Sequence, residues 1–240
     1  MNNENEFTGA DILLKALKDQ EVDTIFGYPG GAVLPIYDAI FGQNFLKHVL
    51  VRQEAGAVHA AEGYARSSGK VGVLLVTSGP GVTNVVTGLT DALMDSIPIV
   101  CISGQVPSHL IGTDAFQECD TTGITRPCTK HNYLVKDVSK LSETIHEAFK
   151  IASSGRPGPV LIDIPKDVQF AKSKYISKKD ISFREHRIKA GSKNVDKNFV
   201  EELVSHIKKS EKPIFYVGGG CLNSGHQASH ELINLVNKTN

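Results

Sequence analysis

The segment VGVLLVTSGPGVTN, residues 71–84, decides the fold of this chain. Residues 71–76 are an apolar run of strand length, which is typical of a parallel strand that helices cover on both faces. Gly79 and Gly81 then permit a sharp turn, and Pro80 between them stiffens it. A helical pattern follows the turn, so the segment predicts one strand–turn–helix unit of a parallel sheet.

Strands and helices alternate in the same way on both sides of this segment. Short apolar runs predict further strands at 22–26, 48–51, 97–102, 133–135 and 160–164. Helical spacing predicts helices after Thr8, after the loop 27–31, and over about 54–66 and 142–153. Because such alternation builds βαβ units, residues 7–165 are expected to form an α/β domain with a parallel sheet flanked by helices.

Composition limits the partners and the location of the protein. Lys plus Arg and Asp plus Glu both total 26, so no global charge favours nucleic acid or an anionic membrane as a partner. No apolar run reaches the roughly 18 residues of a membrane span, and the polar start resembles no targeting signal. The four cysteines form no C-x-x-C pair and no cluster with histidine at metal-ligand spacing. We therefore expect free thiols, a reducing cytoplasmic location and no metal site in this chain.

The composition changes after residue 165. Residues 166–197 contain ten Lys or Arg against four Asp or Glu, so a basic surface linker is expected at 166–195. Beyond it a helix at 196–208, a strand at 213–217, a glycine run at 218–220 and a helix at 227–236 are predicted. These elements are too few to cover both faces of a sheet, so residues 196–240 are expected to be the truncated start of a second, Rossmann-like α/β domain.

Two glycine-rich turns are candidate binding loops. The turn 77–81 precedes a helix, whose free N–H groups can bind a phosphate, yet the P-loop Lys and the G-x-G-x-x-G spacing are both absent. A plain turn and a site for a ring or a carbonyl both stay open there. In the second turn Asn223 replaces the third glycine of the dinucleotide fingerprint, which favours a tight turn over a dinucleotide site.

Two further positions carry candidate ligand-binding side chains. Phe116 and Gln117 lie in a long loop and would place an apolar wall beside a hydrogen-bonding amide, which suits a keto acid. A Phe packed in the core beside a solvated Gln is the equal alternative. Arg156 lies on a stiff turn and could bind a phosphate or a carboxylate, although a surface salt bridge is the commoner role. Lys166 by itself is interpreted as a linker residue.

Glu54 opens a helix whose next residues are nearly all small or apolar. Small side chains let another backbone approach closely, which favours packing against a sheet or a partner subunit. A carboxylate at the mouth of such a helix needs a partner or a catalytic role. His59 and Glu62 on the same helix are interpreted as structural or solvated rather than catalytic.

Taken together, these segments resemble the N-terminal, pyrimidine-binding domain of the acetolactate synthases, the acetohydroxyacid synthase branch of the thiamine-diphosphate enzymes. The residues that carry the resemblance are GYPGGA at 27–32, VRQE at 51–54, VTSGPG at 76–81, DSIP at 95–98, SGQV at 103–106, GTDAFQE at 112–118 and SGRPGP at 154–159. The resemblance covers about residues 7–168 and continues less specifically beyond them. Gln53 and Ala55 depart from the His and Gln that often flank this Glu in the family.

The resemblance implies a role for each residue near the pyrimidine ring of thiamine diphosphate. Glu54 would hydrogen-bond N1′ of the aminopyrimidine and favour the tautomer whose N4′ nitrogen removes the proton from C2. Tyr28, Pro80 and Asn84 would contact the pyrimidine, and Gln117 would lie near the reacting atoms.

The resemblance also implies roles farther from the ring. Phe116 and Lys166 would line the substrate channel, and Arg156 would contact FAD. In this family the diphosphate and Mg²⁺ are bound through a Gly-Asp-Gly…Asn motif in a C-terminal domain, and FAD is bound largely by a middle domain of which 196–240 would be the start. The motif is absent from this sequence, so the chain alone is expected to be inactive.

The function implied is the condensation of pyruvate with pyruvate or 2-oxobutyrate, with loss of CO₂, in branched-chain amino acid biosynthesis. The implied partners are the 2-keto acids, a second copy of the chain in a homodimer or tetramer, and a small regulatory subunit. Two alternatives stay open. One is another thiamine-diphosphate-dependent decarboxylase or carboligase of 2-keto acids, and the other is a non-catalytic fragment that keeps the dimerisation fold.

Overall fold

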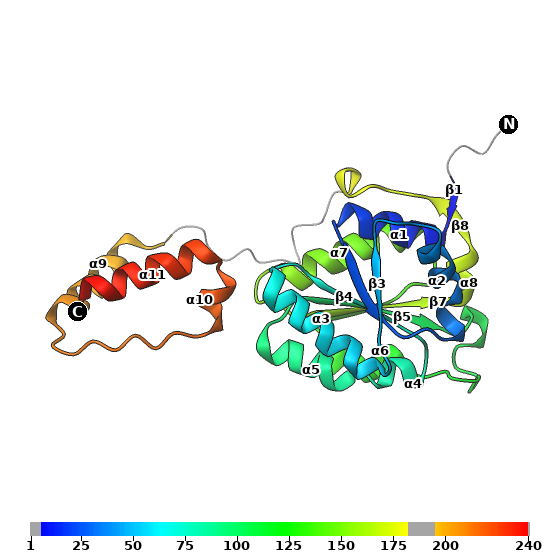
Figure 1. Ribbon diagram of the computed structural model, residues 1–240, viewed down its shortest axis with the longest axis horizontal. Helices are drawn as coiled ribbons and strands as arrows, with labels where there is room; N and C mark the ends of the chain where they lie inside the picture. The colour runs from blue at the N-terminus through cyan, green and yellow to red at the C-terminus, as the bar shows by residue number, and fades with distance from the viewer. Residues whose placement is uncertain (1–5, 182–194, 240) are drawn as a thin grey trace. The chain divides into compact units, whose positions relative to one another are not determined.

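The computed structural model describes residues 6–181 and 195–239 of the 240-residue chain (Figure 1). The chain divides into two compact units, residues 1–189 and 190–240. The candidate site lies in the first unit.

A six-stranded sheet forms the centre of the first unit. Its strands are β2 (Thr24–Gly27), β3 (Lys47–Leu50), β4 (Gly72–Val76), β5 (Ile99–Gln105), β6 (His131–Leu134) and β7 (Pro159–Pro165). The strand order is β3-β2-β4-β5-β7-β6 and every neighbouring pair is parallel, so all six strands end at the same edge. The α/β fold with a parallel sheet flanked by helices is confirmed.

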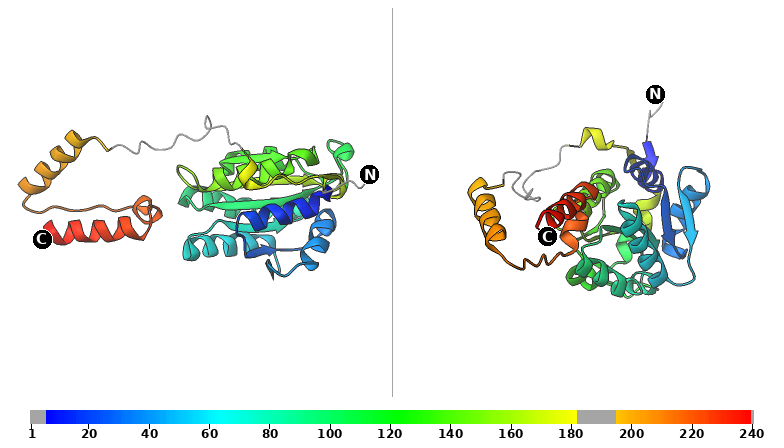
Figure 2. Two further views of the ribbon diagram at one scale, coloured as in Figure 1. Left: turned by 90° about the horizontal axis from the view of Figure 1, so that it is seen from above. Right: turned by 60° about the vertical axis from the view of Figure 1, so that its left-hand side comes forward.

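Helices cover both faces of the sheet, as Figures 1 and 2 show. The helices of this unit are α1 (Gly9–Asp19), α2 (Leu34–Phe41), α3 (Glu54–Ser68), α4 (Pro80–Thr83), α5 (Val86–Asp95), α6 (Thr121–Thr125), α7 (Leu141–Ser153) and α8 (Lys166–Phe170). Short 3₁₀ turns lie at η1 (Gly31–Val33), η2 (Ser108–Leu110), η3 (Arg126–Cys128), η4 (Val138–Lys140) and η5 (Lys178–Asp180). Helices α1 and α7 lie on one face, and α3 and α5 lie on the other.

Neighbouring residues of the central strands supply two separate cores. Leu75 packs with α1, α2 and α7, whereas Leu74 packs with α3 and α5 on the opposite face. Successive side chains of a strand point to opposite faces, so a strand buried on both must be apolar at every position. All five residues of β4 are buried, as the unbroken run at 71–76 predicted.

Residues 166–181 belong to the first unit, although the sequence placed them in a basic linker. Helix α8 buries Val168 and Gln169, and Gln169 Nε2 donates a 2.7 Å hydrogen bond to the carbonyl oxygen of Ala32. Strand β8 (Lys172–Lys174) then pairs antiparallel with β1 (Glu6–Thr8). The high lysine content suggested a linker. The lysines are solvated, however, while residues between them pack against the rest of the first unit. The rest of the expected linker, up to residue 194, lies outside the described residues.

The second unit is described over residues 195–239. It contains α9 (Lys197–Lys209), α10 (Gly219–Asn223) and α11 (His226–Thr239), so the helices predicted at its two ends are confirmed. The strand predicted at 213–217 is wrong: residues 195–239 contain no strand, and Ile214 and Tyr216 are fully exposed. A strand needs a neighbour for its N–H and C=O groups, and these residues offer none. The assignment to a FAD-binding-type domain stays a prediction.

Two other predictions concern the thiols and the membrane. All four cysteines are free, as expected. Burial raises the pKa of the Cys101 thiol far above its usual value, so this residue acts as a small apolar side chain. Across residues 6–181 and 195–239, no helix combines the length and apolar character that crossing a membrane requires.

Candidate active site

The candidate site is built by the loops that leave the carboxyl ends of the parallel strands, where open α/β sheets bind their ligands. The loops after β2 and β4 lie together there. The backbone N–H of Ala32 donates to Thr77 Oγ1 at 3.3 Å, and a Cβ at Gly30 would lie 2.5 Å from the Cβ of Thr77. Only glycine at position 30 lets the two loops approach so closely. Because Gly30 has no side chain, its bare backbone surface lies beside the start of α4.

Glu54 is the first residue of α3 and lies at this same edge. The side chain of Gln53 caps the helix by accepting a hydrogen bond from Gly56 N at 3.2 Å. Glu54 is 8% exposed, and its Oε2 accepts a 2.9 Å hydrogen bond from Asn84 Nδ2. The helix N-terminus also favours a negative charge at this position. Glu54 and Asn84, far apart in sequence, therefore form one constellation, as the resemblance implied.

The turn between β4 and α4 carries Pro80 and touches the loop of Gln117. Gly79 has φ +55° and ψ −113°, and a Cβ there would lie 2.5 Å from the carbonyl oxygen of Gln117. A Cβ at Gly81 would lie 2.7 Å from Thr77 Cγ2 and 3.8 Å from Glu54 Oε1. The turn is thus packed between the Glu54 carboxylate and the backbone of Gln117.

The loop of Phe116 and Gln117 is held by its own carboxylate. Glu118 Oε2 accepts a 3.0 Å hydrogen bond from Ala115 N, and Oε1 accepts one from Gly112 N. These backbone hydrogen bonds, that from Gly112 first, lower the pKa of Glu118. Gln117 has φ +57°, a left-handed conformation that few side chains adopt. The loop is therefore folded back on itself and presents a defined surface.

The aromatic candidates are available to a ligand. Phe116 is 87% exposed, so the alternative in which it packs in the core is wrong. Tyr28 is 38% exposed at the end of β2, and its backbone N–H donates to Leu75 O at 3.3 Å. Pro80 is exposed at the start of α4.

Lys166 and Arg156 lie at opposite ends of β7. Lys166 follows the carboxyl end of that strand and begins α8, at the same edge of the sheet as Glu54. Arg156 precedes the strand, which at about 3.3 Å per residue spans roughly 20 Å. Its guanidinium donates to Ser96 Oγ at 2.7 Å and to the carbonyl oxygens of Leu93 at 3.1 Å and Met94 at 2.7 Å. The structure therefore does not bring Arg156 together with Glu54, and its contact with FAD stays a prediction.

A buried polar network behind this edge was missed in the sequence. Asp163 accepts hydrogen bonds from Ser103 Oγ at 2.7 Å and from Gln105 Nε2 at 2.9 Å. Burial raises the pKa of Asp163 to about 7, although these hydrogen bonds oppose the shift. Gln105 Nε2 also donates to Cys119 O at 3.1 Å, which ties the network to the Gln117 loop. The signal was present, because three polar residues interrupt two otherwise apolar strands.

Comparison with known proteins shows which proteins this part of the chain resembles. Residues 7–124 match the family described as "Thiamine pyrophosphate enzyme, N-terminal TPP binding domain". Over these residues the chain is therefore similar to the N-terminal domain of the thiamine pyrophosphate enzymes.

The individual relatives that the chain matches carry the name acetolactate synthase. The chain is 51% identical over 220 residues to "Acetolactate synthase, chloroplastic" of Arabidopsis thaliana, covering 91% of this chain and 32% of the relative. It is 48% identical over 234 residues to "Acetolactate synthase isozyme 3 large subunit" of Escherichia coli, covering 96% and 40%. It is 50% identical over 220 residues to "Acetolactate synthase catalytic subunit, mitochondrial" of Saccharomyces cerevisiae, covering 90% and 32%.

The resemblance to acetolactate synthase is thus confirmed over most of the chain. The chain spans 32% to 40% of the length of these relatives, so their whole activity is not carried over by similarity alone. The residues present fit the pyrimidine half of thiamine diphosphate. They offer a buried carboxylate, an amide, an exposed tyrosine ring and a glycine surface that a Cβ would fill.

Proposed function

We propose that this chain supplies the pyrimidine-binding half of the active site of an acetolactate synthase. The enzyme condenses pyruvate with pyruvate or 2-oxobutyrate and releases CO₂, a step of branched-chain amino acid biosynthesis. The observation that carries the proposal is the Glu54 carboxylate, buried at the start of α3 and hydrogen-bonded by Asn84, within a thiamine pyrophosphate enzyme domain.

Each residue of the constellation has a physical role in this proposal. Thiamine diphosphate, when bound, supplies the nucleophilic carbon and the electron sink that the reaction needs. Glu54 hydrogen-bonds the N1′ nitrogen of the pyrimidine and exchanges a proton with it. Asn84 fixes the orientation of the Glu54 carboxylate. Exclusion of water from Glu54 strengthens its hydrogen bond because the local dielectric constant is low.

The loop after β5 and the start of α8 bind the 2-keto acid. Phe116 offers an apolar surface for the methyl or ethyl group of the substrate, and Gln117 places an amide beside it. Lys166 supplies a positive charge for the substrate carboxylate from the same edge of the sheet. The left-handed backbone of Gln117 and the close contact with Gly79 keep this surface near the β4–α4 turn.

The proposal extends to groups and partners that the resemblance implies. These are Mg²⁺ and FAD in the complete enzyme, a second copy of the chain that closes the pyrimidine site in a homodimer or tetramer, and a small regulatory subunit. The free cysteines support a reducing, cytoplasmic location. The isolated 240-residue chain is expected to form no acetolactate.

Replacement of Glu54 by Gln tests the proposal in a complete enzyme that contains these residues. The exchange of the C2 proton of thiamine diphosphate for deuterium, followed by NMR, should be nearly abolished because an amide cannot exchange a proton with N1′. Glu143→Gln is a matched control, since Glu143 is an exposed carboxylate in the first turn of α7. Unchanged exchange in Glu54→Gln contradicts the role of Glu54. Acetaldehyde rather than acetolactate as the wild-type product contradicts the reaction.

A further inference from the structure

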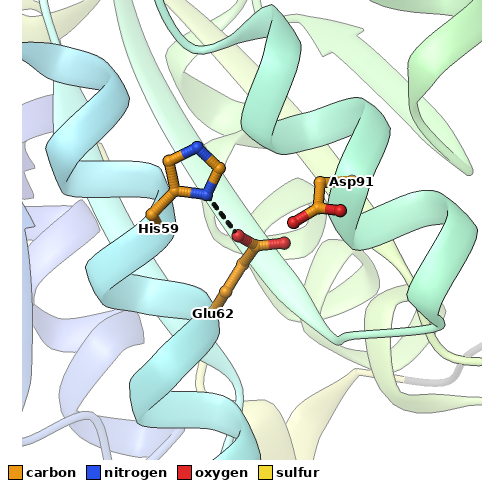
Figure 3. A group of neighbouring side chains, drawn as sticks. All are labelled: His59, Glu62 and Asp91. Atoms are coloured by element: carbon orange, nitrogen blue, oxygen red, sulfur yellow. Dashed lines mark hydrogen bonds and ion pairs between the residues drawn. The ribbon is translucent and has the colours of Figure 1, made fainter.

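His59, Glu62 and Asp91 meet between α3 and α5, away from the constellation of Glu54 (Figure 3). His59 and Glu62 lie three residues apart on α3, and Asp91 faces them from α5. His59 Nδ1 lies 2.7 Å from Glu62 Oε2. Each residue offers one ligand atom, and these atoms all lie within 4.8 Å of one another.

Glu62 separates this group from an ordinary cluster of surface charges. Glu62 is only 4% exposed, and its Oε1 is buried with no hydrogen-bond partner. In Figure 3 the Glu62 carboxylate lies between His59 and Asp91. The charge of Arg66 lowers the pKa of Glu62 slightly, but its guanidinium is paired with Asp95. A buried carboxylate oxygen without a partner is costly, so the geometry calls for a positive ligand between these side chains.

We propose that His59, Glu62 and Asp91 bind one divalent transition-metal ion, such as Zn²⁺. An imidazole nitrogen with two carboxylate oxygens suits Zn²⁺, Mn²⁺ or Co²⁺, whereas Mg²⁺ and Ca²⁺ prefer oxygen ligands alone. The side chain of His59 is 49% exposed, so water completes the coordination from the open side.

Electrostatics supports the same conclusion. Burial raises the pKa of Glu62, and the nearby charge of Asp91 raises it further, although the hydrogen bond of His59 opposes the shift. A cation placed between Glu62 and Asp91 would offset the burial and the like charge that act on Glu62. The ion would also link α3, which begins at Glu54, to α5. It is separate from the Mg²⁺ of the complete enzyme, which the resemblance assigns to a domain outside these residues.

Metal titration of the 240-residue chain tests the proposal. The chain is first freed of metal with a chelator and then titrated with Co²⁺, followed by visible absorption, and with Zn²⁺, followed by competition with an indicator. We expect one equivalent to bind and the melting temperature to rise with Zn²⁺. In Glu62→Gln the affinity should fall at least ~10-fold and the rise in melting temperature should disappear, because a ligand is lost. Glu62→Gln keeps the volume of the side chain and should fold without metal.

Two controls keep the result specific. His226 and His230 lie four residues apart on α11 and could bind metal by themselves, so His226→Asn is compared and should bind as the wild type does. If Glu62→Gln does not fold, the same titration and melting measurements are made on Asp91→Asn, because Asp91 is an exposed ligand. The proposal is overturned if no stoichiometric binding occurs, if both ligand variants bind like the wild type, or if His226→Asn alone removes binding.

Discussion

Asn84 Nδ2 donates a hydrogen bond of 2.9 Å to Glu54 Oε2 and so joins the end of α4 to the start of α3. The two residues lie 30 positions apart and come from loops that follow different strands. The amide fixes one oxygen of the carboxylate, which orients the other. Asn84 is therefore a positioning residue for Glu54 as well as a candidate contact of the pyrimidine.

Asn84→Ala should weaken the binding of thiamine diphosphate by roughly 10-fold or more in a complete enzyme. A hydrogen bond to a charged group contributes about 1.5–3 kcal/mol, and the carboxylate loses its fixed orientation. Isothermal titration calorimetry with Mg²⁺ present measures the dissociation constant. Thr83→Ala is the control, because the Thr83 hydroxyl donates only to the carbonyl oxygen of Pro80, at 3.3 Å. Equal affinity in Asn84→Ala and Thr83→Ala would contradict the positioning role.

Gly79→Ala should destabilise the first unit by about 2–4 kcal/mol. The backbone of Gly79, at φ +55° and ψ −113°, is strained for any residue with a Cβ. That Cβ would also meet the carbonyl oxygen of Gln117 at 2.5 Å, and a backbone atom cannot move aside cheaply. Urea unfolding followed by circular dichroism measures the loss of free energy.

Gly69→Ala is the matched control for this prediction. Gly69 also has a positive φ, +71°, but a Cβ there would meet nothing within 4 Å. It should therefore cost only about 1 kcal/mol, the ordinary penalty of a left-handed residue. If both variants lose the same free energy, the contact between Gly79 and Gln117 does not constrain the turn.

The sheet was predictable because its signals are local. The apolar runs that predicted β4 and β7 report burial on both faces, and the structure has both strands buried throughout. The strand predicted at 213–217 is wrong because its formation depends on a condition that is not local. An apolar run becomes a strand only if another strand lies beside it. The packing of residues 166–181 was hidden for the same reason, since β8 depends on its pairing with β1.

The site was predictable only in part. Glu54 and Asn84 were predicted as site residues from the resemblance, and the structure joins them by a hydrogen bond. His59 and Glu62 stand at helical spacing, but their partner Asp91 comes from a different helix, and nothing in the sequence pairs the two helices. For Asp163 the polar residues in two apolar strands were a visible signal, but its pairing with β5 was not.

Asp163→Asn should change how stability depends on pH. The pKa of Asp163 is raised from 3.8 to about 7 in the folded chain, so the folded state binds a proton more tightly than the unfolded state. The stabilisation of the folded state by protonated Asp163 is fully present below about pH 4 and is lost as the pH rises through about 7. A shift of this size corresponds to roughly 4 kcal/mol. Asparagine keeps the shape but cannot ionise, so this loss should disappear.

Urea unfolding at intervals between about pH 4 and pH 8 measures this dependence. The free energy of unfolding of the wild type should fall relative to that of Asp163→Asn as the pH rises. Asp167→Asn is the control, because Asp167 is exposed on α8 and accepts hydrogen bonds from Ser108. Parallel profiles for the wild type and Asp163→Asn would show that Asp163 is ionised over the whole range.

Arg156→Ala should destabilise the first unit by about 1 kcal/mol even without FAD. The guanidinium donates to Ser96 Oγ and to two of the last carbonyl oxygens of α5, and a positive charge at a helix C-terminus is favourable. Arg156→Lys should recover only part of the loss, because an ammonium keeps the charge but not the planar fork of donors.

Lys136→Ala is the control for this prediction. Lys136 is an exposed cation on the loop after β6, so its replacement should change stability by less than ~0.5 kcal/mol. Unfolding of the 240-residue chain measures all three variants, and an unchanged stability in Arg156→Ala would contradict the stabilising role of this residue.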